Sequence, residues 1–153
     1  MSNTMAQSLS QMTATTFEEL ALLVPDASPS DAQSMQALDV AVSVDYRGPF
    51  NGRLILRVSA CVMPTITANM LGEDHAREPG LQHDALGELA NVVCGNVLPA
   101  IGGAGAVFHL AAPRMHADLD ALAQDTATPA ARVEFGVDEG RVEAQLFIVQ
   151  RAA

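Results

Sequence analysis

The spacing of apolar and polar positions divides the chain into alternating strands and helices. Apolar residues recur at every second position over 38–46 and again over 52–60, which is typical of half-buried strands. The residues between these runs include Gly48, Pro49 and Gly52 and predict a turn. Three more strands are predicted over 107–112, 132–137 and 141–150, and Asp138-Glu-Gly140 predicts a tight turn between the last two.

Three segments show the longer period of helices. The first is predicted from Thr16 to Pro25, because Thr16 and Glu19 have the spacing of a capping box. The others are predicted over 64–72 and 81–98, the latter ending at Pro99. Residues 1–15 are rich in Ser, Thr and Gln and predict a flexible segment before a single domain over 16–153. We therefore expect an α+β fold, with an antiparallel or mixed sheet of about five to six strands packed against about three helices.

Composition and charge restrict the possible functions. Of the 153 residues 49% are hydrophobic, enough for a core, and the formal net charge is −10. Such a charge disfavours binding to nucleic acid or to an anionic membrane surface. The N-terminus lacks the basic and apolar regions of a signal peptide, so a cytoplasmic location is expected. Cys61 and Cys94 lie in apolar runs and are expected to be buried, reduced thiols, with a structural disulfide as the lesser alternative.

The helix predicted over 81–98 has two chemically different sides. On a helical wheel one sector is apolar and predicts the core; it contains Leu86, Leu89, Ala90, Val93 and Val97. The opposite sector, which we call the polar stripe, contains Asp84, Glu88, Asn91 and Gly95. The stripe has no Lys or Arg, it places two like charges four residues apart, and its glycine costs about 1 kcal/mol relative to alanine. Choices that work against helix stability indicate a functional site, although a polar sector is also what any surface helix shows.

Other candidate chemistries have weaker support. The four histidines, at positions 75, 83, 109 and 116, do not have the spacing of metal ligands, so no metal site is predicted. The glycines at 102, 103 and 105 follow a helix, whereas a phosphate-binding loop precedes one. No Ser or Cys has the sequence context of a catalytic nucleophile.

The polar stripe resembles the signature of the CheC/CheX/FliY family of chemotaxis phosphatases. That signature places an acidic residue or Ser, then Glu, then Asn on an exposed helix, as in Asp84-x-x-x-Glu88-x-x-Asn91 here. The family's downstream proline is matched by Pro113, about one residue short of the usual spacing. The segments 16–21 and 65–73 also resemble CheX helices. The single copy of the motif is similar to CheX, because CheC has two.

The resemblance implies a phosphatase that acts on the phospho-aspartyl receiver CheY. Asn91 would enter the receiver's site and position the attacking water, and Glu88 would pair with the receiver's lysine. Asp84 would orient the partner at the rim, and Gly95 would allow it to approach closely. No intrinsic cofactor is expected, because Mg²⁺ would be supplied by the receiver.

Two classes of function therefore remain open at this point. The first is the receiver phosphatase, and the second is a non-catalytic module of the same fold that binds a receiver or a flagellar-switch component. The intact pair of Glu88 and Asn91 favours catalysis. The resemblance also implies a homodimer formed through the sheets, for which the strand predicted over 141–150 would supply an exposed edge.

Overall fold

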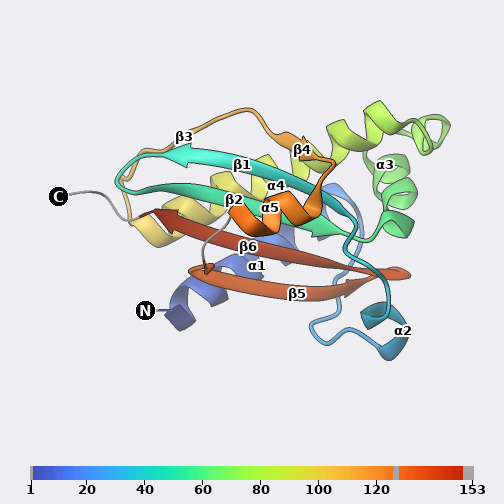
Figure 1. Ribbon diagram of the computed structural model, residues 1–153, viewed down its shortest axis with the longest axis horizontal. Coiled ribbons are helices and arrows are strands. Elements are labelled where there is room, and N and C mark those ends of the chain that lie inside the picture. Colours follow the sequence, from blue (N-terminus) through green and yellow to red (C-terminus); the bar gives the residue numbers. More distant parts are fainter. Residues whose placement is uncertain (1, 126–127, 150–153) are drawn as a thin grey trace.

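The computed structural model describes residues 2–125 and 128–149 and contains one antiparallel sheet (Figure 1). Its strands are β1 (Val40–Arg47), β2 (Asn51–Val58), β3 (His109–Leu110), β4 (Arg114–His116), β5 (Ala131–Val137) and β6 (Gly140–Val149). The order across the sheet is β3-β1-β2-β6-β5, and β4 pairs with β1 beside β3. The helices are α1 (Ser2–Leu20), α2 (Asp31–Ser34), α3 (Met63–Leu71), α4 (Pro79–Gly102) and α5 (Leu119–Asp125).

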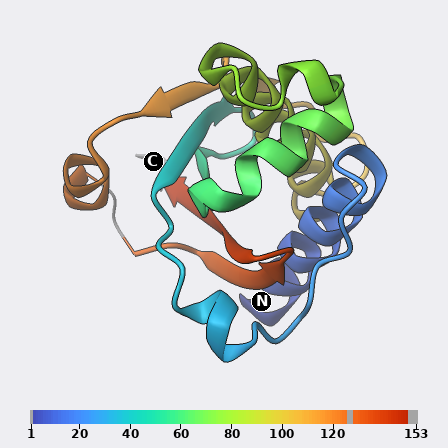
Figure 2. The ribbon, with the colours of Figure 1, turned by 90° about the vertical axis from the view of Figure 1, so that its right-hand side faces the viewer.

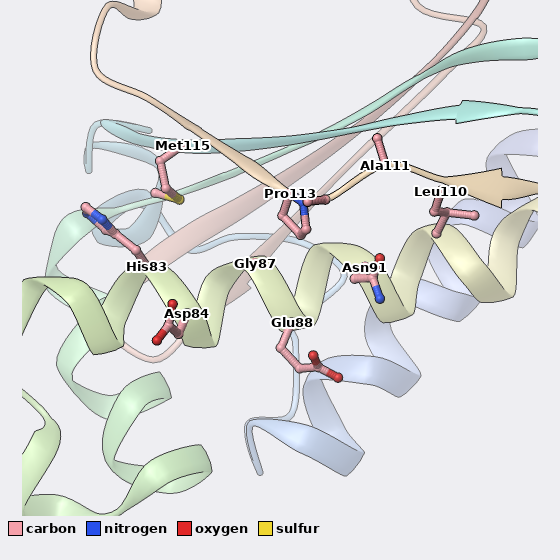
Figure 3. Close-up of a pocket in the computed structure, with 10 residues that line it drawn as sticks. His83, Asp84, Gly87, Glu88, Asn91, Leu110, Ala111, Pro113 and Met115 are labelled. Atoms are coloured by element: carbon pink, nitrogen blue, oxygen red, sulfur yellow. The ribbon is translucent and has the colours of Figure 1, made fainter.

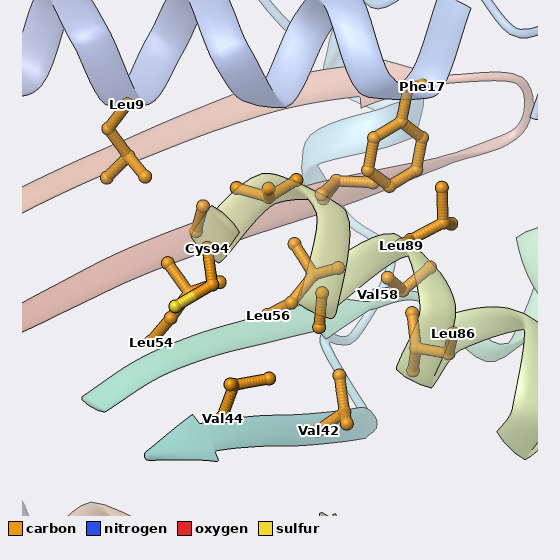
Figure 4. Packing of buried hydrophobic residues seen from close by; sticks show 14 of the residues in the cluster. Leu9, Phe17, Val42, Val44, Leu54, Leu56, Val58, Leu86, Leu89 and Cys94 are labelled. Atoms are coloured by element: carbon orange, nitrogen blue, oxygen red, sulfur yellow. The ribbon is translucent and has the colours of Figure 1, made fainter. Parts of the chain in front are cut away.

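The two faces of the sheet are covered very differently. Helices α1, α3 and α4 lie on one face, and of the described helices only the short α5 lies on the other (Figure 2). The main core fills the space under the three helices, where Leu54 and Leu56 of β2 meet Phe17 of α1 and Leu89 of α4 (Figure 4). Alternate strand residues face this core, as the period of two requires. The predicted α+β fold with an antiparallel sheet is therefore confirmed.

The outer face of the sheet is polar, with one small apolar cluster. Ala41, Ile55 and Phe147 are buried there beneath Leu119 and Leu122 of α5. Around them, arginines pair with acidic residues across neighbouring strands, such as Arg53 with Asp45 at 2.7 Å and Arg141 with Glu134 at 3.0 Å. Within the described residues, every ion pair that involves an arginine lies on this face.

Residues 2–15 are helical, so the prediction of a flexible lead-in over 1–15 and a helix start at Thr16 is wrong for them, and residue 1 lies outside the described residues. Helix α1 begins at Ser2, and its Leu9 is fully buried. Thr16 lies inside the helix, where its hydroxyl donates to the carbonyl oxygen of Met12 at 2.7 Å. Buried Thr13 and Thr16 occupy core-facing positions, and polar residue types at those positions concealed the helical period.

Two further predictions are also wrong, one about where α4 ends and one about the place of β6 in the sheet. Helix α4 continues through Pro99 to Gly102 and is capped by Gly103, whose φ of +93° favours glycine and whose N–H bonds to the Pro99 carbonyl oxygen. Pro99 is exposed, and its ring costs the helix one backbone donor.

Strand β6 is central, between β2 and β5, so it offers no open edge. The outermost strands are β5 on one side and β3 with β4 on the other.

Candidate functional site

The structure places the two sides of α4 as the sequence predicts. The apolar side is fully buried in the core: Leu86, Leu89, Ala90, Val93 and Val97 are each 0% exposed. Asp84, Glu88 and Gly95 of the polar stripe are exposed, and Asn91 is half-buried. Asn91 is therefore more enclosed than the other members of the polar stripe.

A groove of about 470 Å³ lies between α4 and the edge strands (Figure 3). Its helical wall includes Asp84, Glu88 and Asn91, and its opposite wall is the chain from Leu110 to Pro113 together with Met115. Three of the four predicted site residues therefore meet in one groove. Gly95, the fourth, does not line it, and the space around Gly95 is open.

A β-bulge shapes the second wall of the groove. Leu110 lies opposite Tyr46, whereas Arg114 lies opposite Ser43. The edge therefore advances four residues, from 110 to 114, while β1 advances three, from 46 to 43. The extra residue lies within 111–113, a stretch that includes Pro113, which has no N–H to pair and is tolerated at edges and bulges. The sequence alone predicted one continuous strand over 107–112 and missed this bulge.

Gly87 fixes the distance between the two walls. It is buried on α4, and a Cβ added there would lie 3.3 Å from the Cβ of Pro113, closer than ordinary contact. Figure 3 shows Pro113 directed toward the helix at Gly87. Sequence reasoning singled out Pro113 but missed Gly87; a glycine in the middle of a helix, which costs stability, was the available signal.

His83 is a second groove residue that sequence reasoning missed. It lies at the end of the groove beside Asp84, on the side of Met115 (Figure 3). Two other histidines have structural partners: the His75 ring lies 3.2 Å from the Glu78 carboxylate, and the His116 ring lies 2.6 Å from the Ser43 hydroxyl. Burial, followed by the charges of Arg114 and Arg53, lowers the pKa of His116. Among the described residues, no cluster of three or more His, Cys, Asp or Glu side chains has the arrangement of a metal site.

The groove is acidic, and its described lining has no cysteine or hydroxyl side chain. Asp84 and Glu88 form no ion pair within the described residues, and the lining includes no Ser, Thr, Cys, Tyr or Lys. Cys94 is on the same helix but buried in the core, and burial raises the pKa of its thiol to about 12. Cys61 is exposed, so the prediction of two buried thiols is wrong for Cys61; both thiols are free. The groove can hydrogen-bond a water molecule or attract a cation, but it offers no cysteine or hydroxyl nucleophile.

Helix α4 is unusually apolar for a helix that carries an exposed polar stripe. Among the described residues it is the one helix long and apolar enough to cross a membrane, with a mean hydropathy of 1.3 over its most apolar window. Half of that window is buried inside the protein, where its apolar side faces the sheet. The high hydropathy is accounted for by its place as the core helix.

Several solved structures share this fold. The CheX chemotaxis protein of Desulfovibrio desulfuricans has a TM-score of 0.72 at 20% identity, over 95% of this chain and 99% of its own. CheX in the CheX–CheY–BeF₃–Mg²⁺ complex of Borrelia burgdorferi has a TM-score of 0.68 at 15% identity, covering 94% and 97%. FliY of Thermotoga maritima has a TM-score of 0.60 at 15% identity, covering 95% and 88%. The fold is thus that of the CheC, CheX and FliY proteins.

The family follows from the sequence itself. The profile of the family described as chemotaxis phosphatase CheX matches residues 40–136, which include the whole groove. The chain has no significant match among curated protein sequences. The chain belongs to the CheX family, as the motif on α4 suggested.

Proposed function

We propose that this protein is a cytoplasmic phosphatase of a phosphorylated CheY-like receiver in chemotaxis. The observation that carries the proposal is the placement of Asn91, half-buried in a groove one turn from the exposed Glu88. Membership of the CheX family supports it, and a CheX protein with this fold has been crystallised with CheY, BeF₃ and Mg²⁺. An acidic groove also suits a partner whose site carries a metal ion and a lysine.

The reaction would use a water molecule as the nucleophile. The water oxygen attacks the phosphorus in line, the bond between phosphorus and the aspartyl oxygen breaks, and the products are inorganic phosphate and the free carboxylate. The receiver's Mg²⁺ and lysine would stabilise charge on the phosphoryl oxygens. This chain would contribute positioning, because the Asn91 carboxamide can accept a hydrogen bond from the water while remaining uncharged beside the phosphoryl group.

The other residues of the polar stripe would hold the two proteins in register. Glu88 has no ion-pair partner among the described residues, so its carboxylate is available to pair with the receiver's lysine. Asp84 lines the groove one turn earlier and would contact the rim of the receiver's site. Gly95 adds no side chain at the far end of the stripe, which would let the receiver's backbone approach the helix.

The homodimer that the resemblance implies is also a proposal, with a changed interface. Since β6 is internal, the outermost strand β5 is the better candidate for pairing with a second copy. Asp26 bridges to Gly136 and covers part of that strand, so pairing would use the end nearer Ala131. Sedimentation of the purified chain would show a dimer if this is correct and a monomer at all accessible concentrations if it is not.

Turnover separates the phosphatase from the non-catalytic binding module. A phosphorylated receiver in large excess is mixed with the chain, and released phosphate is followed over time. A catalyst accelerates release of many phosphates per chain. A chain that binds the receiver, yet leaves phosphate release at the spontaneous rate, would be a binding module for a receiver or a flagellar-switch component.

A further inference from the structure

The outer strand of the groove has an unpaired backbone edge. The N–H of Ala111 donates to the carbonyl oxygen of Asp45 at 2.9 Å, so Ala111 turns its N–H toward β1. In an antiparallel ladder the neighbours on either side must turn theirs the other way. Leu110, the last residue of β3 in register with β1, therefore directs its N–H and C=O groups away from the sheet, and Ala112 lies beyond this paired region.

This edge is accessible at the same place. Within the described part of the chain, Ala112 makes no hydrogen bond through either backbone group. Ala111 and Ala112 are exposed, and both line the groove. Their side chains are single methyl groups, which allow another backbone to come close. Open edges of this kind are usually blocked, or used for binding an extended segment.

The bulge limits how long such a segment can be. Pro113 has no N–H, and the register shifts by one residue between Leu110 and Arg114, so regular pairing cannot continue beyond Ala112. The free edge is thus a short site over Leu110–Ala112. Pro113 packs near Gly87 and holds this site beside the helix that carries Asn91.

We propose that an extended segment of the phosphorylated receiver pairs with the edge at Leu110–Ala112 while Asn91 occupies the receiver's site. This inference rests on the proposed function. In a doubly wound α/β receiver the site lies at the carboxyl ends of parallel strands, among the loops that follow them. A groove that accepts this site must accept those loops too, and its far wall offers free backbone donors and acceptors. Main-chain pairing provides affinity that does not depend on the receiver's side chains.

The test removes one backbone donor from the edge. Ala112→Pro deletes the unpaired N–H, and Ala112→Ser is the matched control that keeps it. Binding of a beryllofluoride-loaded, Mg²⁺-bound receiver is titrated with wild type and both variants, and phosphate release is measured at saturating receiver. Circular dichroism melts establish that the variants are folded.

We expect Ala112→Pro to raise the Kd about three- to tenfold relative to Ala112→Ser, the effect of losing one hydrogen bond, with a smaller effect on the rate at saturation. Exchange of the Ala112 amide with deuterium should also slow when the receiver binds to wild type.

Equal Kd values for Ala112→Pro and Ala112→Ser, with no amide protection, would overturn the edge proposal while leaving Asn91-dependent hydrolysis intact. Amide protection that rises with chain concentration in the absence of a receiver would assign the edge to a second copy instead. Wild type that neither binds the receiver nor accelerates phosphate release would overturn the proposed function and this inference together.

Discussion

The two sides of α4 use the same backbone for opposite purposes. The side that contains Leu86 and Leu89 is fully buried and joins the helix to the sheet, whereas the polar stripe makes no ion pair within the described residues. The buried side therefore carries the stability of the helix. The polar stripe contributes little to stability, so its residues can serve binding and catalysis. We therefore expect mutations on the buried side to change stability and mutations in the polar stripe to change activity.

The largest effect on folding should come from the buried side. Leu89→Ala removes a side chain that is 0% exposed and leaves a cavity, so we expect a loss of about 2–5 kcal/mol in the free energy of unfolding. Urea denaturation followed by circular dichroism measures it. Phosphate release per folded molecule should remain near wild type. A loss below about 1 kcal/mol would mean that the contact between α4 and the sheet is not the main packing of the fold.

Glu88 should show the reverse behaviour. Glu88→Gln keeps the shape of the side chain and removes its charge, and we expect the Kd for a phosphorylated receiver to rise about tenfold, the effect of a lost charge-assisted hydrogen bond. Since Glu88 is exposed, stability should change by less than about 0.5 kcal/mol. Titration at increasing salt provides a second readout, because the difference between wild type and the variant should shrink as charges are screened. Asp84→Asn is the comparison, with a smaller effect expected at the rim.

Two glycines on α4 provide the finest test of the comparison. Gly95 has open space around it, so Gly95→Ala should stabilise the helix by about 0.5–1 kcal/mol and, if the receiver approaches closely there, weaken binding. Gly87→Ala should instead destabilise by about 1 kcal/mol, because the new Cβ crowds Pro113. Thermal melts of the two variants measure the difference. Equal gains in stability would show that Pro113 moves without cost and that Gly87 does not set the width of the groove.

The sequence predicted features that lie within one helix or strand better than features that depend on contacts between distant segments. The core side and polar stripe of α4 were visible because they follow one helical period within one element. Helix α1 was cut short because buried threonines at positions 13 and 16 resemble a polar linker and a cap. The bulge at Pro113 and its contact with Gly87 depend on the pairing of distant segments, which no local pattern contains.

Asn91 itself provides the most direct test of the account. Phosphate release from a phosphorylated receiver is compared for wild type, Asn91→Ala and Asn96→Ala, the last being the same substitution at an exposed residue of the same helix that does not line the groove. The account predicts that Asn91→Ala reduces the accelerated rate about 10²-fold, as when one preorganised polar group is removed from an active site. It also predicts that receiver binding is largely retained and that Asn96→Ala behaves like wild type. An Asn91→Ala protein that releases phosphate as fast as wild type would contradict the role of Asn91 in positioning the water.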